Sequence, residues 1–259
     1  MGGSFLTVFV VALVAALASP LGGLLAMWLR PSSLLLSMAV GLAGGVLLGT
    51  FAFEMLPQAL EFVHLAWVVA GFALGFGTVY LLDLYVNRWA VAGLEADQKG
   101  RVDRLHRRLR PRGSSTSVLA GGTSSEEIIE GIVIGVGAAL APGTAFVVGL
   151  AITIDNISEA MSIGELILSD GQENAKRRIL LWTSLIGASL FGSTMLGWVL
   201  LRSLSEGIQG LLFAIGAGGM FYLTITDLVP EAEAHQFQQS AALAIGVGFL
   251  LVLVLSRLT

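Results

Sequence analysis

The sequence predicts an all-α integral membrane protein with eight transmembrane helices. Hydrophobic residues make up 55% of its 259 residues and charged residues only 12%, with a mean hydropathy of +0.85. These values lie well outside the range of soluble globular domains. The apolar runs are continuous and do not alternate with polar residues, which argues against a β-barrel. The 33 glycines suit close packing between membrane helices.

Eight runs of the sequence each come close to the roughly 20 residues that a bilayer requires. They are Phe5–Leu29, Ser33–Leu60, Leu65–Val86, Val118–Ala141, Thr144–Leu168, Ile179–Leu201, Ile208–Val229 and Ala241–Leu258. The fourth contains several acidic residues, so hydropathy alone would miss it. No basic segment precedes the first run, which predicts a membrane span and not a cleaved signal peptide. We expect one transmembrane domain over residues 1–259.

The one long hydrophilic segment, about residues 87–122, separates the third span from the fourth. We predict a cytoplasmic linker here, with a short amphipathic helix at Asp97–Leu109. With eight spans, twelve basic residues fall on one side of the membrane and two, Arg202 and Arg257, on the other. Basic loops face the cytoplasm, so both termini are expected to be extracellular or periplasmic. The linker lacks interleaved aromatic residues, which argues against nucleic-acid binding.

Two matching acidic patterns interrupt the fourth and fifth spans at an offset of 29 residues. Their members are Glu126, Glu127 and Glu130 in the fourth span, and Asp155, Asn156 and Glu159 in the fifth. Spacings of three and four residues place each set on one helix face, although Glu127 could face another direction. A tight turn at Pro142-Gly143 makes the two spans antiparallel neighbours and brings both sets to the same depth.

Carboxylates at that depth require a counter-charge, and neither Lys nor Arg accompanies them. Either protons or a divalent cation must therefore neutralise them. Oxygen ligands suit Mg²⁺, Mn²⁺ and Fe²⁺ and also admit Zn²⁺. The cation would be a transported substrate, and no cofactor is expected. No nucleophile–base pair is recognisable, so an enzyme is not predicted. The alternative is that Ser and Thr hydroxyls satisfy these acids as ordinary packing groups.

A second internal repeat relates the second span to the seventh. Glu54 with Pro57 corresponds to Asp227 with Pro230 at an offset of 173 residues, and each proline predicts a kink. The two spans run in opposite directions, so the repeat is inverted, which is a common plan for transporters. Glu54 near the outer end, Asp227 near the inner end and the nearby Glu231 are candidates for the substrate pathway.

These residues resemble the ZIP (Zrt/Irt-like) divalent metal transporters, especially their bacterial branch, over nearly the whole chain. The similarity includes G-G-V-L-L-G-T-F-A-F-E-M-L-P-Q-A in the second span and D-L-V-P-E-A in the seventh. The family's H-N-x-P-E-G motifs in the fourth and fifth spans are replaced here by E-E-I-I-E-G and D-N-I-S-E-A. The resemblance implies a primary metal site at Glu126, Glu130, Asp155 and Glu159, and a neighbouring second site at Glu127 and Asn156.

The resemblance further implies import of Zn²⁺, Mn²⁺ or Fe²⁺ into the cytoplasm by alternating access. Acidic residues stand at both histidine positions, which favours a harder ion such as Mn²⁺. Ser189 occupies the place of a glutamate that many members carry on the sixth span, and this weakens the case for a binuclear site. Ser189 is a further candidate for the substrate pathway. A proton-coupled exporter or exchanger and a non-transporting membrane metal sensor stay as alternatives, and a homodimer is one assembly that the sequence leaves open.

Overall fold

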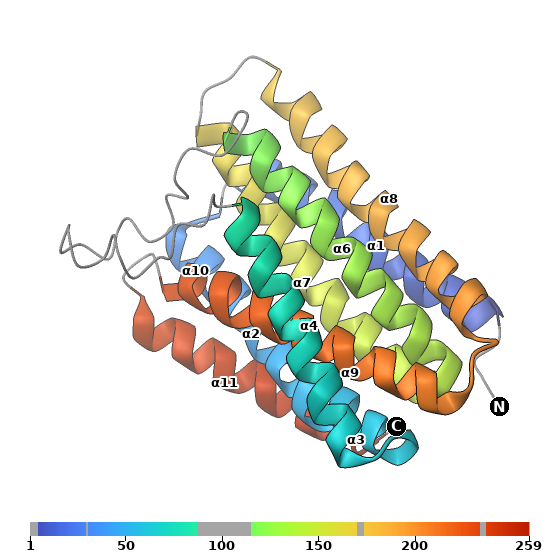
Figure 1. The fold of residues 1–259 in the computed structure, drawn as a ribbon. Coiled ribbons are helices and arrows are strands. Elements are labelled where there is room, and N and C mark those ends of the chain that lie inside the picture. The colour runs from blue at the N-terminus through green and yellow to red at the C-terminus, as the bar shows by residue number, and fades with distance from the viewer. Residues whose placement is uncertain (1–4, 30, 87–114, 170–173, 234–236, 259) are drawn as a thin grey trace.

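A computed structural model describes residues 5–29, 31–86, 115–169, 174–233 and 237–258 of the chain (Figure 1). These residues form helices joined by short turns, and no strand occurs among them. Most of the predicted linker, including the expected helix at Asp97–Leu109, lies outside the described residues.

The helical elements largely reproduce the predicted spans. They are α1 (Phe5–Leu29), α2 (Ser33–Thr50), η1 (Phe51–Met55), α3 (Leu56–Phe62), α4 (Leu65–Val86), α6 (Ser115–Leu140), α7 (Pro142–Ser169), α8 (Ala175–Leu201), α9 (Glu206–Leu223), η3 (Thr224–Leu228), α10 (Val229–Glu233) and α11 (Gln238–Leu255). In the described part of the chain, seven helices are long and apolar enough to cross a membrane, counting α2–η1–α3 and α9–η3–α10 as one helix each. The all-helical membrane fold is therefore confirmed.

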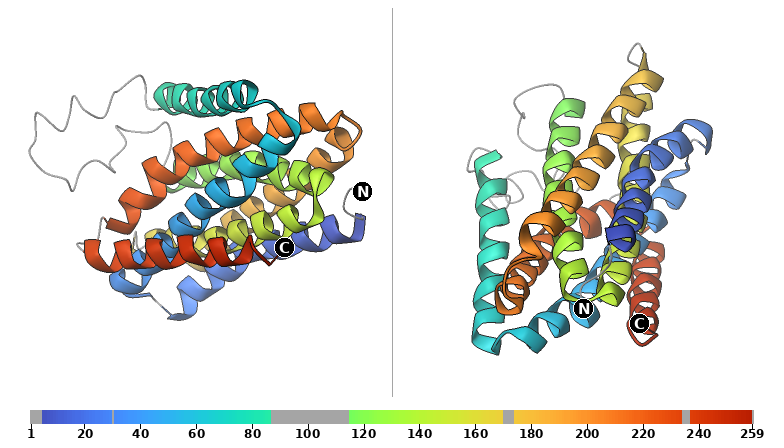
Figure 2. Two further views of the ribbon diagram at one scale, coloured as in Figure 1. Left: turned by 90° about the horizontal axis from the view of Figure 1, so that it is seen from below. Right: turned by 90° about the vertical axis from the view of Figure 1, so that its right-hand side faces the viewer.

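α6 is the helix that hydropathy alone leaves out. Its 26 residues extend for about 39 Å at 1.5 Å per residue, enough to cross a bilayer. The start of α1 and the end of α11 lie at the same end of the bundle (Figures 1 and 2), which requires an even number of crossings. α6 therefore supplies the eighth crossing. It begins at Ser115, so residues 115–122 are helical and not part of the linker as predicted.

The helices separate into two groups, visible on opposite sides of the bundle in Figure 1. In the first group, α1 packs along α7 and α8, and α6 packs along α8; in the second, α2 packs along α11 and α4 along α9. Glycines permit this close approach: a Cβ on Gly45 would overlap the carbonyl of Ile245, and one on Gly75 would overlap the carbonyl of Ile215. α7 also packs against α2, and α6 against α9, which joins the two groups.

The inverted repeat reappears as two π-helical turns at the predicted offset of 173 residues. η1 and η3 each close with a five-residue hydrogen bond, from the Leu56 N–H to the Phe51 carbonyl and from the Val229 N–H to the Thr224 carbonyl. Both turns directly precede the prolines, because a proline ring collides with the carbonyl four residues back and widens the turn. α3 and α10, which follow these turns, lie towards opposite ends of the bundle (Figure 1).

The helix contacts obey the same repeat. In this repeat α2 corresponds to α9, and α4 corresponds to α11. The contact between α2 and α11 therefore has its equivalent in the contact between α9 and α4. Likewise, α1 corresponds to α8 and α6 corresponds to α7. The contact between α1 and α7 has its equivalent in the contact between α8 and α6. The two acid-bearing helices, α6 and α7, are thus equivalent members of one repeat, as the matching patterns at an offset of 29 predict.

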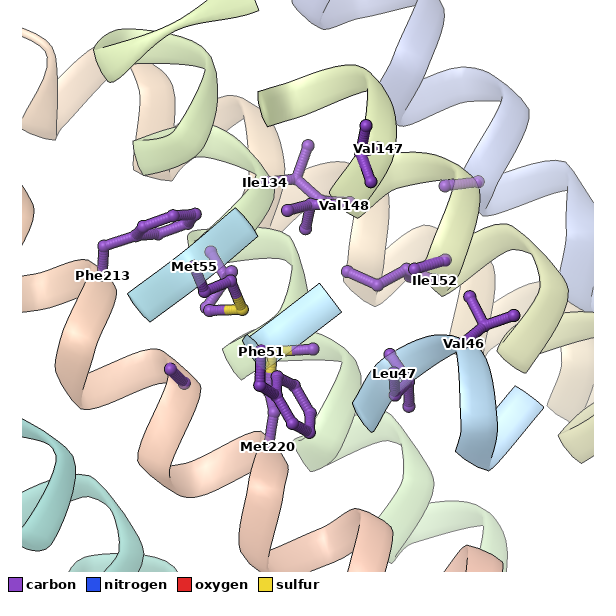
Figure 3. Close-up of a cluster of buried hydrophobic side chains, with 14 of the residues drawn as sticks. Val46, Leu47, Phe51, Met55, Ile134, Val147, Val148, Ile152, Phe213 and Met220 are labelled. Carbon is purple, nitrogen blue, oxygen red and sulfur yellow. The ribbon is translucent and has the colours of Figure 1, made fainter. Parts of the chain in front are cut away.

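The largest hydrophobic cluster lies where the two groups meet (Figure 3). It joins Leu47, Phe51 and Met55 of α2–η1 to side chains of α6, α7 and α9, among them Ile152 and Phe213. Its α7 members precede Asp155 in the sequence. The cluster therefore packs between the α6–α7 turn and the acidic residues, and it closes the bundle on that side of them.

Candidate metal site

The acidic residues are positioned by a tight connection between α6 and α7. α6 ends at Leu140 and α7 begins at Pro142, so Ala141 alone separates them. The Ala141 N–H donates to the Gly137 carbonyl at 2.9 Å, and the Ala145 N–H donates to the Ala141 carbonyl at 3.2 Å. A proline is well suited to the first position of a helix, where its missing N–H has no partner to lose. The two helices consequently run antiparallel and side by side.

The predicted offset of 29 residues corresponds to a direct contact. Asn156 Nδ2 donates a hydrogen bond to Glu127 Oε2 at 3.4 Å, which places the two residues at the same depth. Both side chains are only 1% exposed. The spacing of the acids left the direction of Glu127 open, and the structure turns it inward against α7.

The remaining acidic residues join the same cluster. The Glu130 carboxylate interacts electrostatically with Glu127, Asp155, Glu159 and Glu126. Glu130 and Asp155 are buried, and Glu126 and Glu159 are half-buried. Within the described part of the chain, no Lys, Arg or His is among the groups that act on Glu127, Glu130 or Asp155. The structure therefore brings all six predicted residues into one cluster, in which the charges that act on Glu127, Glu130 and Asp155 are all acidic among the described residues.

Four oxygens of this cluster are buried and accept no hydrogen bond. They are Glu127 Oε1, Glu130 Oε2, Asp155 Oδ1 and Asn156 Oδ1. Buried oxygens without a partner are rare in folded proteins and cost stability. In the conformation described, no three His, Asp or Glu side chains of the described residues converge at metal-ligand spacing. The oxygens are thus close enough to repel one another but are not closed around a common point, and a cation would draw them together.

One predicted pathway residue, Glu231, interacts with this cluster. It projects from α10, and its carboxylate acts electrostatically on Asp155 of α7. Glu54, in η1, is buried and interacts with Thr144 at the start of α7, whose Oγ1 donates to Gln58 Oε1 at 3.1 Å. Glu54 and Glu231 therefore both connect the second helix group to α7.

The other two predicted pathway residues interact with different neighbours. Asp227, in η3, is half-buried and acts electrostatically on Tyr222, whose hydroxyl donates to Asp83 at 2.9 Å. Ser189 of α8 is half-buried, and its carbonyl accepts a hydrogen bond from Ser193 Oγ at 2.8 Å.

Two contacts of the cluster were not anticipated. Ser193 Oγ also lies 3.1 Å from the Glu127 carbonyl and so ties α8 to α6 beside the acids. Asn156 Nδ2 lies 3.4 Å from the Ala15 carbonyl of α1. Ser193 follows Ser189 by one helical turn, so helix periodicity offered a signal for it. A backbone carbonyl of α1 carries no such signal in the sequence.

The chain matches one family of known proteins. The sequence model of a family described as ZIP zinc transporter matches residues 97–255, which is more than half of the chain and includes α6 to α11. A search of curated proteins finds no match to this chain.

Proposed function

Since the chain belongs to the ZIP zinc transporter family, we propose that it moves Zn²⁺, Mn²⁺ or Fe²⁺ across the membrane towards the cytoplasm. Membership of this family implies a multi-pass membrane protein that transports a divalent metal ion, and a transporter instead of an enzyme. The metal, the direction, the site and the transport cycle are parts of the proposal and are argued from the chain's own residues.

The transported ion binds between α6 and α7. Its ligands come from the six residues Glu126, Glu127, Glu130, Asp155, Asn156 and Glu159. The observation that carries this assignment is the set of four buried oxygens without a hydrogen-bond donor, from Glu127, Glu130, Asp155 and Asn156. A divalent cation is the partner that satisfies several such oxygens at once. The ligands must lose protons as the ion enters, so uptake is coupled to pH.

The ion reaches and leaves the site by alternating access, in which the two repeats move relative to one another. Glu54 guides the ion at the outer end, and Glu231 and Asp227 guide it at the inner end. Ser189 borders this route on α8. In the proposed orientation the hydrophobic cluster around Phe51 and Met55 lies on the outer side of the site, and it must separate for the ion to enter. The distribution of Lys and Arg supports this orientation, with both termini outside.

The ligand chemistry favours Mn²⁺ over Zn²⁺. All six candidate side chains offer oxygen, whereas tetrahedral zinc sites are commonly built with histidine nitrogen or cysteine sulfur. The chain contains no cysteine and only three histidines. His64 is exposed at the end of a helix, distant in sequence from both acidic sets. An ion that accepts six oxygen ligands, including water, fits this set best.

Metal uptake into proteoliposomes tests the proposal. Purified protein is reconstituted, and Mn²⁺, Zn²⁺ and Fe²⁺ uptake is compared between the wild type and a Glu130→Ala plus Glu159→Ala variant. We expect uptake in the wild type and its loss in the variant. A Glu61→Ala plus Glu206→Ala variant removes the same charge from exposed positions and should transport normally. Unchanged uptake in the first variant would refute the site.

The same preparation separates the two alternative functions. A proton-coupled exporter or exchanger would move metal against the expected direction when the proton gradient is reversed. A membrane metal sensor would bind metal through the same carboxylates but give no flux in either direction. Binding without flux would therefore favour the sensor.

A further inference from the structure

Ser19 is a buried polar residue of α1 that lies against the acidic helix α7. It is 0% exposed, and the contacts of two neighbouring residues of α1 define its surroundings. One turn before it, the Ala15 carbonyl accepts the hydrogen bond from Asn156 Nδ2. One turn after it, a Cβ on Gly22 would overlap the Ile157 carbonyl and approach the Ala160 Cβ to 2.9 Å. Residues 15, 19 and 22 share one helix face, so Ser19 faces α7 between Asn156 and Ala160.

This position matches the depth of the acidic cluster. α1 and α7 run in parallel, since Val11 contacts Gly149 near one end of the pair and Ala26 contacts Gly164 near the other. Ser19 therefore lies level with the turn of α7 that carries Asp155 and Glu159. The absence of side chains at Gly22 and Gly149 keeps the two helices close there, so the Ser19 hydroxyl lies at the α1–α7 contact, on the side of α7 that carries Asn156.

In the described part of the chain the Ser19 hydroxyl, like that of Thr194, is fully buried without a hydrogen-bond partner, whereas several other hydroxyls buried in these helices are paired. Thr50, Thr183 and Thr224 each donate to the carbonyl four residues earlier, at 2.8 to 2.9 Å, which is the usual solution in an apolar environment. For Ser19 that carbonyl belongs to Ala15, which Asn156 already engages. Ser19 Oγ has no hydrogen-bond partner. A fully buried hydroxyl is thus left unpaired one helical turn from the carbonyl that Asn156 Nδ2 engages, and Asn156 Oδ1 is unpaired as well.

We propose that Ser19 binds the transported cation, as a neutral oxygen ligand that α1 adds next to Asn156. The inference rests on the proposed transport function and extends its site from two helices to three. Ser19 and Asn156 form the neutral side of the site, and the carboxylates of α6 and α7 form the charged side. Neutral oxygens raise the number of ligands without adding negative charge. They therefore favour an ion with six oxygen ligands, such as Mn²⁺, over four-coordinate Zn²⁺.

Binding of Mn²⁺ and Zn²⁺ to the purified full-length protein tests this assignment. In Ser19→Ala the Kd for Mn²⁺ should rise about 10-fold, the lower end of the loss seen when a residue that supports a metal site is removed. The Kd for Zn²⁺ should change less. Thermal unfolding without metal should not be lowered, because the deleted hydroxyl makes no hydrogen bond in the protein.

Ser37→Ala is the matched control. Ser37 is equally buried at 0% exposed, but it lies on α2, and its Oγ donates to the Ala232 carbonyl at 2.6 Å. This variant should show the opposite behaviour, a lower unfolding temperature with an unchanged Kd for Mn²⁺. A lowered unfolding temperature and a wild-type Kd in Ser19→Ala would overturn the proposal, because Ser19 would then be a packing residue.

A cysteine variant gives a readout that packing alone cannot produce. The chain has no cysteine, so Ser19→Cys introduces a single thiol at the α1–α7 contact. A thiolate prefers soft ions, and the affinity for Cd²⁺ relative to Mn²⁺ should rise at least 10-fold over the wild type. Ser37→Cys should give no such change. The absence of any gain in Ser19→Cys would also overturn the proposal.

The Glu130→Ala plus Glu159→Ala variant in the same assay distinguishes failure of the proposed metal site from failure of the proposed role of Ser19. Wild-type protein that binds no divalent cation, or a double variant that binds as well as the wild type, would refute the proposed site and with it the role of Ser19. Loss of binding in the double variant together with wild-type Kd values in Ser19→Ala would refute the role of Ser19 alone.

Discussion

The two helix groups differ in how completely their buried polar side-chain atoms are hydrogen-bonded. In the second group, hydroxyls and amides find partners in the protein. Examples are Ser37 with the Ala232 carbonyl, Thr50 with the Val46 carbonyl, Thr224 with the Met220 carbonyl and Tyr222 with Asp83. In the described residues, the buried side-chain oxygens that lack a partner all belong to the first group. They come from Ser19, Glu127, Glu130, Asp155, Asn156, Ser162 and Thr194.

This difference indicates that the second group supports the fold and that the first group binds the ion. In the second group, the described helices pack closely and their buried polar side chains are hydrogen-bonded, as expected of a group with a structural role. The first group retains unsatisfied oxygens that cost stability, and proteins tolerate such a cost mainly at functional sites. Mutations in the second group should therefore lower the stability of the protein. Mutations of the unpaired residues in the first group should lower Mn²⁺ binding and preserve or raise the stability.

The largest expected effect concerns packing in the second group. Gly45→Val would drive a side chain into the Ile245 carbonyl of α11 and should destabilise the protein by about 3 kcal/mol, the upper end of the usual cost of overpacking. Thermal unfolding in detergent measures this. Gly246→Val on α11 is the control, because nothing lies within 4 Å of a Cβ there. Equal stability of the two variants would contradict the view that this group depends on close packing.

The next effect concerns a carboxylate of the first group. Glu130→Met removes a buried charge but keeps the volume, so the metal-free protein should gain about 2 kcal/mol of stability while Mn²⁺ binding falls at least 10-fold. Unfolding without metal and Mn²⁺ titration measure the two quantities. Glu206→Met, at an exposed position, should change neither. A loss of stability in Glu130→Met would show that the carboxylate is satisfied by the protein.

The smallest effect concerns a hydrogen bond of the second group. Tyr222→Phe deletes the bond to Asp83 between α9 and α4 and should cost about 1 kcal/mol, with the Kd for Mn²⁺ unchanged. Tyr85→Phe, at an exposed tyrosine, should leave stability unaltered. A changed Kd in Tyr222→Phe would weaken the separation between a supporting group and a binding group.

Much of this architecture could be predicted because it depends on local patterns. Span length follows from bilayer thickness, and spacings of three and four residues define a helix face. The offset of 29 residues anticipated the pairing of Glu127 with Asn156. The offset of 173 predicted matching kinks near Pro57 and Pro230, where the structure has π-helical turns. The start of α6 at Ser115 was less accessible, because its Ser and Thr residues read as a polar linker although they continue the helix.

The sequence by itself determined which residues share a face and at what depth they lie, since helix geometry converts spacing directly into position. Only the tertiary structure decided which neighbour each face meets, because the rotation of a helix about its own axis depends on the helices packed around it. That rotation turns Glu127 inward, brings Glu231 of α10 towards Asp155 and places Ser19 of α1 against the acidic turn of α7. The acids could be found from their spacing, whereas the residues that surround them required the packed bundle.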